Sequence, residues 1–140
     1  MIEASPVFEN MMIIDDNNID LYITTQTIKR NNIGKTVMPY SIAEDALKFL
    51  QLNALDLSAL PRIILVDIYM PVMSGFEFME AYDKLPTNLK EFCKVFIVSS
   101  SIDSVDLDRA NKDPNVTAFR EKPISVEFLQ EISKLYPTEK

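Results

Sequence analysis

Three short apolar runs narrow the choice of fold for this chain. They read MMII at residues 11–14, IILV at 63–66 and VFIV at 95–98. None of the three alternates with polar residues, and continuous runs of this length are typical of strands that are buried on both faces. The sequence therefore predicts three inner strands of a mostly parallel sheet.

Two further stretches suit strands at the edges of the same sheet. KTVMPY at residues 35–40 and VTAFR at 116–120 hold fewer apolar residues, and these partly alternate with polar ones. Pro39 fits an edge position, because a sheet edge tolerates the missing N–H of proline. The inner strands are then the first, third and fourth along the chain, with the second and fifth outside them.

Apolar residues at three- and four-residue steps predict helices between and after these strands. The clearest stripe extends from Ala43 to Leu57, and Ser41 with Glu44 forms the expected capping box at its start. The chain therefore reads as a strand followed by a helix, five times over. The other helical stretches are residues 19–30, 78–85, 104–112 and 128–135, with Ser125 as the N-cap of the last.

Five strand–helix units in succession call for an α/β fold with a parallel sheet, helices on both faces and right-handed crossovers. With the apolar strands in the middle, the strand order is 2-1-3-4-5, the flavodoxin-like (βα)5 doubly wound arrangement. A chain of 140 residues fits one domain over residues 1–140, with its core at about 11–135.

The composition argues against several classes of function. The chain contains no histidine, which excludes serine–histidine and cysteine–histidine nucleophile pairs and the familiar zinc sites. A net charge of −7 argues against a nucleic-acid partner, since such binding depends on neutralising phosphates. No apolar run approaches the roughly 18 residues of a membrane span. The N-terminus lacks the features of a secretion signal, so a cytoplasmic location is the default expectation.

Polar side chains stand where the predicted strands end. Asp15 and Asp16 follow the first strand, Asp67 ends the third, Ser99 follows the fourth and Lys122 follows the fifth. The carboxyl ends of parallel strands lie at one edge of an open α/β sheet, where such folds bind ligands. Gathered carboxylates repel one another, by about 4 kcal/mol for two charges roughly 4 Å apart at an effective dielectric of about 20. A cation is therefore expected among them, and oxygen ligands favour Mg²⁺.

A magnesium ion, a lysine and a hydroxyl around one aspartate match the groups that stabilise a transferring phosphoryl group. Asp67 would be the attacking nucleophile in such a transfer. A phosphorylated carboxylate is an acyl phosphate, a covalent intermediate that needs no histidine on this chain.

The segments MMIIDDN, LVDIYMPVMSG, VFIVSSS and FREKP, in this order, resemble the receiver domain of two-component response regulators. The resemblance extends over roughly Met11 to Leu135 and implies a single receiver domain. It also implies that Asp67 is the phosphoacceptor, Asp16 a direct magnesium ligand and Asp15 a ligand through water. By the same resemblance, the backbone carbonyl of Tyr69 completes the protein's share of the metal ligands.

The resemblance assigns roles to four further residues. Ser99 matches the hydroxyl residue that follows the phosphoryl group inward on activation, and Lys122 matches the family's lysine. Phe119 matches the aromatic switch residue, although it reads equally well as plain core. Because Phe119 lacks a tyrosine hydroxyl, packing alone would carry the switch signal. The Lys122–Pro123 bond resembles the family's cis peptide, a form essentially confined to proline.

The resemblance implies a phosphoprotein of a two-component phosphorelay that signals and is not an enzyme, although it can assist its own phosphorylation and dephosphorylation. A sensor histidine kinase or a phosphotransfer protein would donate the phosphoryl group to Asp67. An altered surface near residues 104–112 and the fifth strand would then change the binding of a downstream protein. A phosphorylation-dependent dimer is one form that this change can take.

Two other interpretations remain open. The first is a magnesium-dependent phosphohydrolase with an aspartyl-phosphate intermediate, but such enzymes usually carry Asp-x-Asp and this chain reads Asp67-Ile68-Tyr69. The second is a degenerate receiver that acts only as a docking module. For Ser100 and Ser101 we expect only a helix-start loop, and for Gly75 a turn or helix start.

Overall fold

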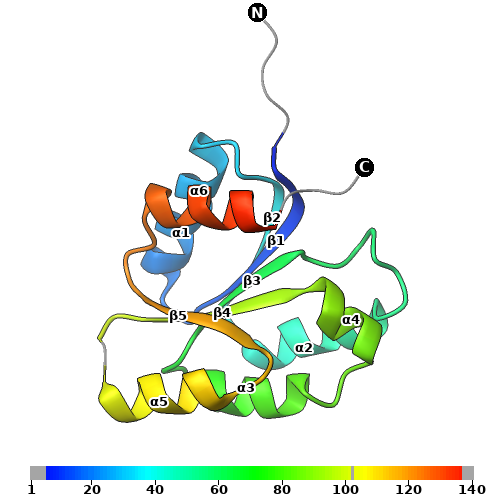
Figure 1. The fold of residues 1–140 in the computed structure, drawn as a ribbon, viewed down its shortest axis with the longest axis vertical. Helices are drawn as coiled ribbons and strands as arrows, with labels where there is room; N and C mark the ends of the chain where they lie inside the picture. The colour runs from blue at the N-terminus through cyan, green and yellow to red at the C-terminus, as the bar shows by residue number, and fades with distance from the viewer. Residues whose placement is uncertain (1–5, 102, 137–140) are drawn as a thin grey trace, which may run out of the picture.

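A single sheet of five parallel strands forms the centre of the protein (Figure 1). The computed structural model describes residues 6–101 and 103–136 of the chain. The strand order is β2-β1-β3-β4-β5, so the predicted flavodoxin-like arrangement is confirmed. The strands are β1 (Phe8–Ile14), β2 (Gly34–Tyr40), β3 (Ile63–Asp67), β4 (Lys94–Ser99) and β5 (Val116–Glu121).

The burial of each strand follows its apolar pattern. Every residue of β3 is buried, as are the last five of β4, because helices cover both faces of the inner strands. The outer strands β2 and β5 each bury one residue fully. Pro39 lies in the outer strand β2, opposite Ile13 of β1, as its missing N–H requires.

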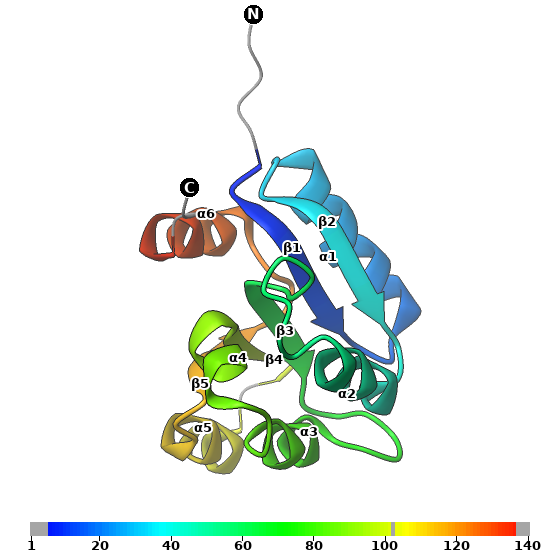
Figure 2. The same cartoon turned by 90° about the vertical axis from the view of Figure 1, so that its right-hand side faces the viewer.

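Helices form a layer on each face of the sheet (Figures 1 and 2). On one face, α1 and α6 pack over an apolar cluster that includes Ile28 and Phe128. On the other face, α2, α3, α4 and α5 pack over a second cluster that includes Leu50, Phe78 and Leu89. The helices are α1 (Asn18–Arg30), α2 (Ala43–Leu52), α3 (Gly75–Tyr82), α4 (Thr87–Phe92), α5 (Ser104–Lys112) and α6 (Val126–Leu135).

The expectation of one helix after each strand is wrong between β3 and β4, where the chain forms both α3 and α4. The helix α4 has six residues and buries only Leu89, so it has no apolar stripe that a periodicity argument could detect. Pro86 precedes it at the N-cap position.

The start and end of α2 also differ from the expectation. The N-cap is Ile42, which supplies no side-chain cap, so Ser41 lies one residue before the cap position and the expected capping box with Glu44 does not form. It ends at Leu52, and the chain turns before Leu57, which is about half exposed. The helical spacing of apolar residues therefore extends beyond the end of the helix, and the predicted end at Leu57 is wrong.

Side-chain caps fix the starts of four other helices. Asn17 caps α1, Asp103 caps α5, Ser125 caps α6 as predicted, and Ser74 forms a capping box with Glu77 at the start of α3. In the described part of the chain, no helix has the length and apolar character that crossing a membrane requires.

Candidate functional site

The carboxyl ends of β1, β3, β4 and β5 bring the predicted polar residues to one edge of the sheet. Asp15 directly follows β1, and its N–H donates to the carbonyl of Tyr40 at 3.0 Å. Asp67 is the last residue of β3 and is paired with Val98 of β4. Ser99 ends β4, and its carbonyl accepts a 2.7 Å hydrogen bond from the N–H of Lys122. Backbone pairing of the sheet thus sets the spacing of the site.

Three carboxylates converge at this edge. One oxygen from each of Asp15, Asp16 and Asp67 lies within 4.8 Å of the others. Asp15 and Asp67 are buried, with 2% and 6% of their surface exposed, whereas Asp16 is exposed. Hard oxygen donors at this separation match the ligand preference of Mg²⁺, with the exposed side left for water or a phosphoryl oxygen.

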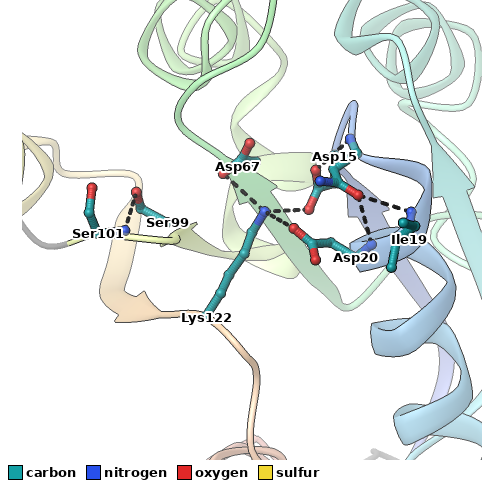
Figure 3. A network of polar contacts seen from close by, with 8 residues as sticks. Asp15, Ile19, Asp20, Asp67, Ser99, Ser101 and Lys122 are labelled. Atoms are coloured by element: carbon teal, nitrogen blue, oxygen red, sulfur yellow. Dashed lines mark hydrogen bonds and ion pairs between the residues drawn. The ribbon is translucent and has the colours of Figure 1, made fainter.

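The amine of Lys122 lies among these carboxylates (Figure 3). Its Nζ donates to Asp15 Oδ2 at 2.6 Å and lies 3.3 Å from Asp67 Oδ1. Burial by itself lowers the pKa of Lys122, but the hydrogen bond to Asp15 and the charges of Asp67 and Asp15 outweigh it, so the pKa is raised. Lys122 therefore keeps its positive charge although its side chain is largely buried.

Burial has the opposite consequence for Asp67. It raises the pKa of the Asp67 carboxyl to about 6, even though the charge of Lys122 lowers it, and the negative charges of Asp15 and Asp16 raise it further. Near neutral pH the carboxylate is still mainly ionised, as a nucleophile must be. It is also held at an energetic cost that a bound cation would relieve.

Asp20, in the first turn of α1, also contacts Lys122 and was missed by sequence reasoning. Its Oδ2 accepts a hydrogen bond from Lys122 Nζ at 3.2 Å (Figure 3). The cap of α1 sets this position, since Asn17 Oδ1 accepts the N–H of Asp20 at 3.1 Å. An acid four residues after Asp16, at the start of a capped helix, is the signal that could have identified it.

Gly75 allows α3 to begin against the loop that follows Asp67. Its N–H donates to the carbonyl of Ile68 at 2.7 Å. A Cβ at this position would lie 2.4 Å from the backbone oxygen of Asp67, a separation that side chains do not reach. Only glycine permits this close approach, which agrees with the expected helix start.

The remaining predicted residues occupy different surroundings. Ser99 is fully buried, and its Oγ accepts the N–H of Ser101 at 3.4 Å (Figure 3). Phe119 lies in the core under α2 to α5 with 6% of its surface exposed. The side chain of Tyr69 is 55% exposed, and its hydroxyl donates to Asp106 of α5. The peptide bond between Lys122 and Pro123 is cis.

Together, the site offers three carboxylates that could hold a cation, with an ionised lysine and a hydroxyl close to the buried Asp67. This set can neutralise the oxygens of a phosphoryl group while a carboxylate oxygen bonds to its phosphorus.

Comparisons with known proteins agree with this description. The chain is 26% identical over 130 residues to the "Probable methanogenesis regulatory protein FilR2" of Methanothrix harundinacea (strain 6Ac), covering 93% of this chain and 81% of that protein. A response regulator receiver protein from Dyadobacter fermentans has a similar crystal structure, with a TM-score of 0.82 and 27% identity, covering 91% of this chain and 96% of that one. A two-component response regulator from Cytophaga hutchinsonii shares the fold, with a TM-score of 0.84 and 23% identity over the same shares of the two chains.

The family described as the response regulator receiver domain matches residues 11–134. This match covers every strand and helix described above except the first residues of β1 and the last residue of α6. The chain belongs to the response regulator receiver family.

Proposed function

We propose that the receiver domain of this protein accepts a phosphoryl group on Asp67 with the help of Mg²⁺. The observation that carries the proposal is the convergence of Asp15, Asp16 and Asp67 within 4.8 Å, with Lys122 Nζ 3.3 Å from Asp67. The donor would be the phosphohistidine of a sensor histidine kinase or a phosphotransfer protein. The result is a signal passed to another protein, so the domain is not itself an enzyme.

The residues present fit a magnesium ion. Asp16 would bind it directly, Asp67 would share it with the phosphoryl group, and Asp15 would reach it through water. The family resemblance adds the backbone carbonyl of Tyr69. The ion would supply positive charge to the phosphoryl oxygens as the transfer proceeds.

The chain's own residues supply the rest of the transfer. A carboxylate oxygen of Asp67 forms the new bond to phosphorus, while the phosphorus–nitrogen bond of the donor breaks and its electron pair stays with the leaving imidazole. Lys122 would donate a hydrogen bond to one phosphoryl oxygen, and the hydroxyl of Ser99 would donate to another. Both groups stabilise the negative charge on the phosphoryl oxygens in the transition state of the transfer.

The surface of α1 supports a protein donor. Ile19, Tyr22 and Ile23 expose 71%, 64% and 48% of their surface on the helix that also carries Asp20. Exposed apolar side chains gathered beside a charged site are typical of a protein interface. A protein that docks there would bring its phosphohistidine to the edge of the sheet that holds Asp67.

The output of the domain would pass through α5 and β5 to a downstream protein or to a second copy of this chain. Among its nine residues α5 buries only Ala110, so few apolar contacts oppose its movement. A phosphoryl group at the end of β3 would draw Ser99 inward, and Phe119 on β5 would repack in response.

Incubation with Mg²⁺ and acetyl phosphate tests the chemistry. We expect mass spectrometry to show one acid-labile phosphoryl group on the wild-type protein, and none on an Asp67→Asn variant. Asp45→Asn, which removes an exposed acid from the first turn of α2, is the matched control and should be labelled like the wild type. Equal labelling of Asp67→Asn, or an unmodified wild type, would refute the proposal. Steady release of phosphate over many turnovers would indicate a phosphohydrolase instead.

A further inference from the structure

Lys122 contacts Asp20, a carboxylate that is not one of the proposed magnesium ligands. The three acids that could hold an ion are Asp15, Asp16 and Asp67. Lys122 Nζ is also hydrogen-bonded to Asp20 at 3.2 Å, and Asp20 lies outside that group (Figure 3). The extra carboxylate therefore acts on the lysine and not on the metal.

The position of Asp20 is built into the start of α1. Asp15 Oδ1 accepts the N–H of Asn17 at 2.9 Å, and Asn17 Oδ1 accepts the N–H of Asp20 at 3.1 Å. This chain of hydrogen bonds ties Asp20 to the same strand end that supplies Asp15. The backbone of Asp20 is therefore held close to Asp15, and both carboxylates contact the amine of Lys122 from there.

Two carboxylates accept hydrogen bonds from Lys122, and a third lies within ion-pair distance of its amine. An ammonium group has three N–H donors. Asp15 and Asp20 each accept one, and Asp67 Oδ1 forms an ion pair with the amine at 3.3 Å. A phosphoryl group on Asp67 adds further acceptors, and these would compete with Asp15 and Asp20 for the donors of the amine.

The two other partners of Lys122 are the ones that a magnesium ion would engage. With an ion present, the charges of Asp15 and Asp67 are shared with it, whereas Asp20 keeps its full attraction for the lysine. Asp20 also borders a shallow cavity of about 250 Å³ together with Ile23, Ser100 and Lys122, which leaves room for the lysine to move.

We propose that Asp20 is a positioning residue that competes with the phosphoryl group for the amine of Lys122, and that it thereby weakens the phosphorylated form. This inference rests on the proposed function of Asp67. It predicts that Asp20 sets how long or how tightly the activated state is held, although it touches neither the ion nor the phosphoryl group.

The test measures the affinity for beryllofluoride, a stable phosphoryl mimic, in saturating Mg²⁺ by NMR titration. We expect Asp20→Asn to bind it about two- to five-fold more tightly than the wild type, the effect of losing a partly exposed ion pair. Asp20→Glu, which keeps the carboxylate, should remain within about two-fold of the wild type. Asp45→Asn removes an equivalent first-turn acid from α2 and should leave the affinity unchanged.

A double-mutant cycle separates this effect from simple removal of a negative charge. If Asp20 acts through the lysine, Asp20→Asn has no effect on beryllofluoride affinity in a Lys122→Met background. The Lys122→Met variant can unfold, because it leaves the buried acids without a positive charge. A second measurement therefore uses only Asp20→Asn and the wild type: the ammonium protons of Lys122 should exchange with solvent faster in Asp20→Asn.

The possible outcomes distinguish this inference from the function on which it rests. If the wild type does not bind beryllofluoride with Mg²⁺, the proposed function falls, and the role of Asp20 falls with it. If the wild type binds but Asp20→Asn behaves like Asp45→Asn, binds more weakly, or keeps its effect without Lys122, only the role of Asp20 is refuted. Unchanged ammonium exchange in Asp20→Asn would refute it as well.

Discussion

A buried carboxylate without a bound cation costs folding free energy, and Asp67 is the residue that shows this most clearly. Burial raises its pKa to about 6, and the neighbouring Asp15 and Asp16 add to the effect of burial. When the pKa of a carboxyl is raised in the folded state, its protonated form stabilises the folded protein. This stabilisation is complete below the pKa of the unfolded state, near 4, and is lost as the pH rises through about 6.

The ion-free protein should therefore become more stable when Asp67 is replaced by asparagine. At pH 7.5 in EDTA, we expect Asp67→Asn to raise the free energy of unfolding by about 1 kcal/mol, because solvent and Lys122 screen part of the cost. Urea unfolding at pH 7.5 and pH 4 measures this, and the gain should shrink at pH 4, where Asp67 is protonated. A loss of stability at pH 7.5 would show that the ion pair with Lys122 outweighs burial and repulsion.

The candidate site divides into residues that the sequence predicts and residues that only the structure reveals. Asp15, Asp16, Asp67 and Lys122 could be predicted to meet, since each follows or ends a parallel strand and the strand order follows from apolar content. Asp20 could not, because its contact depends on how α1 is rotated against the sheet. Side-chain spacing alone does not determine that rotation.

The helices and strands also divide into those that the sequence predicts and those that only the structure reveals. The three inner strands were predictable because unbroken apolar runs of this length are typical of buried strands, and the two outer strands from their partly alternating pattern. The six-residue helix α4 was not, since it buries one side chain and its stability comes from packing against the core. The false capping box at Ser41 has a similar cause, because a cap depends on which residue leaves the helical conformation first, and here this is Ile42.

Side chains at the surface connect α5 to α3 and to the loop after Asp67. The hydroxyl of Tyr69, two residues after Asp67, donates to Asp106 in the first turn of α5. One turn later, the guanidinium of Arg109 lies 4.3 Å from the centre of the Phe76 ring and 3.4 Å from Glu80 of α3. These contacts connect the loop after Asp67 directly to the helix that is proposed to move.

Removing the Tyr69 hydroxyl should loosen α5 without unfolding the protein. We expect Tyr69→Phe to speed amide hydrogen exchange in α5 by about two- to five-fold, since one surface hydrogen bond is lost. Exchange in β3 and β4 should not change, because the sheet does not depend on this contact. Tyr22→Phe, which removes the same hydroxyl from an exposed position on α1, is the control. Equal exchange in α5 for both variants would show that Asp106 does not hold this helix through Tyr69.

At the scale of the whole molecule, the candidate metal site joins strands that are distant in sequence. Asp15 and Asp16 follow β1, Asp67 ends β3, and Lys122, more than 100 positions after Asp15 in the chain, follows β5. The site exists only when the sheet is assembled, so an ion that binds there binds the folded chain and not the unfolded one. Such binding must stabilise the entire fold.

Magnesium should therefore raise the thermal midpoint of the wild-type protein. At an ion concentration about 100 times the dissociation constant, linkage gives about 2.7 kcal/mol, which corresponds to an increase of roughly 8 °C for a chain of this size. Circular dichroism melting with MgCl₂, compared with NaCl at equal ionic strength, measures the shift. Asp16→Asn and Asp67→Asn should each lose most of it, because each removes a direct ligand, whereas Asp45→Asn should keep it. A shift that is equal in NaCl, or that survives in both ligand variants, would mean that the ion acts by screening surface charge and that the three carboxylates do not form a metal site.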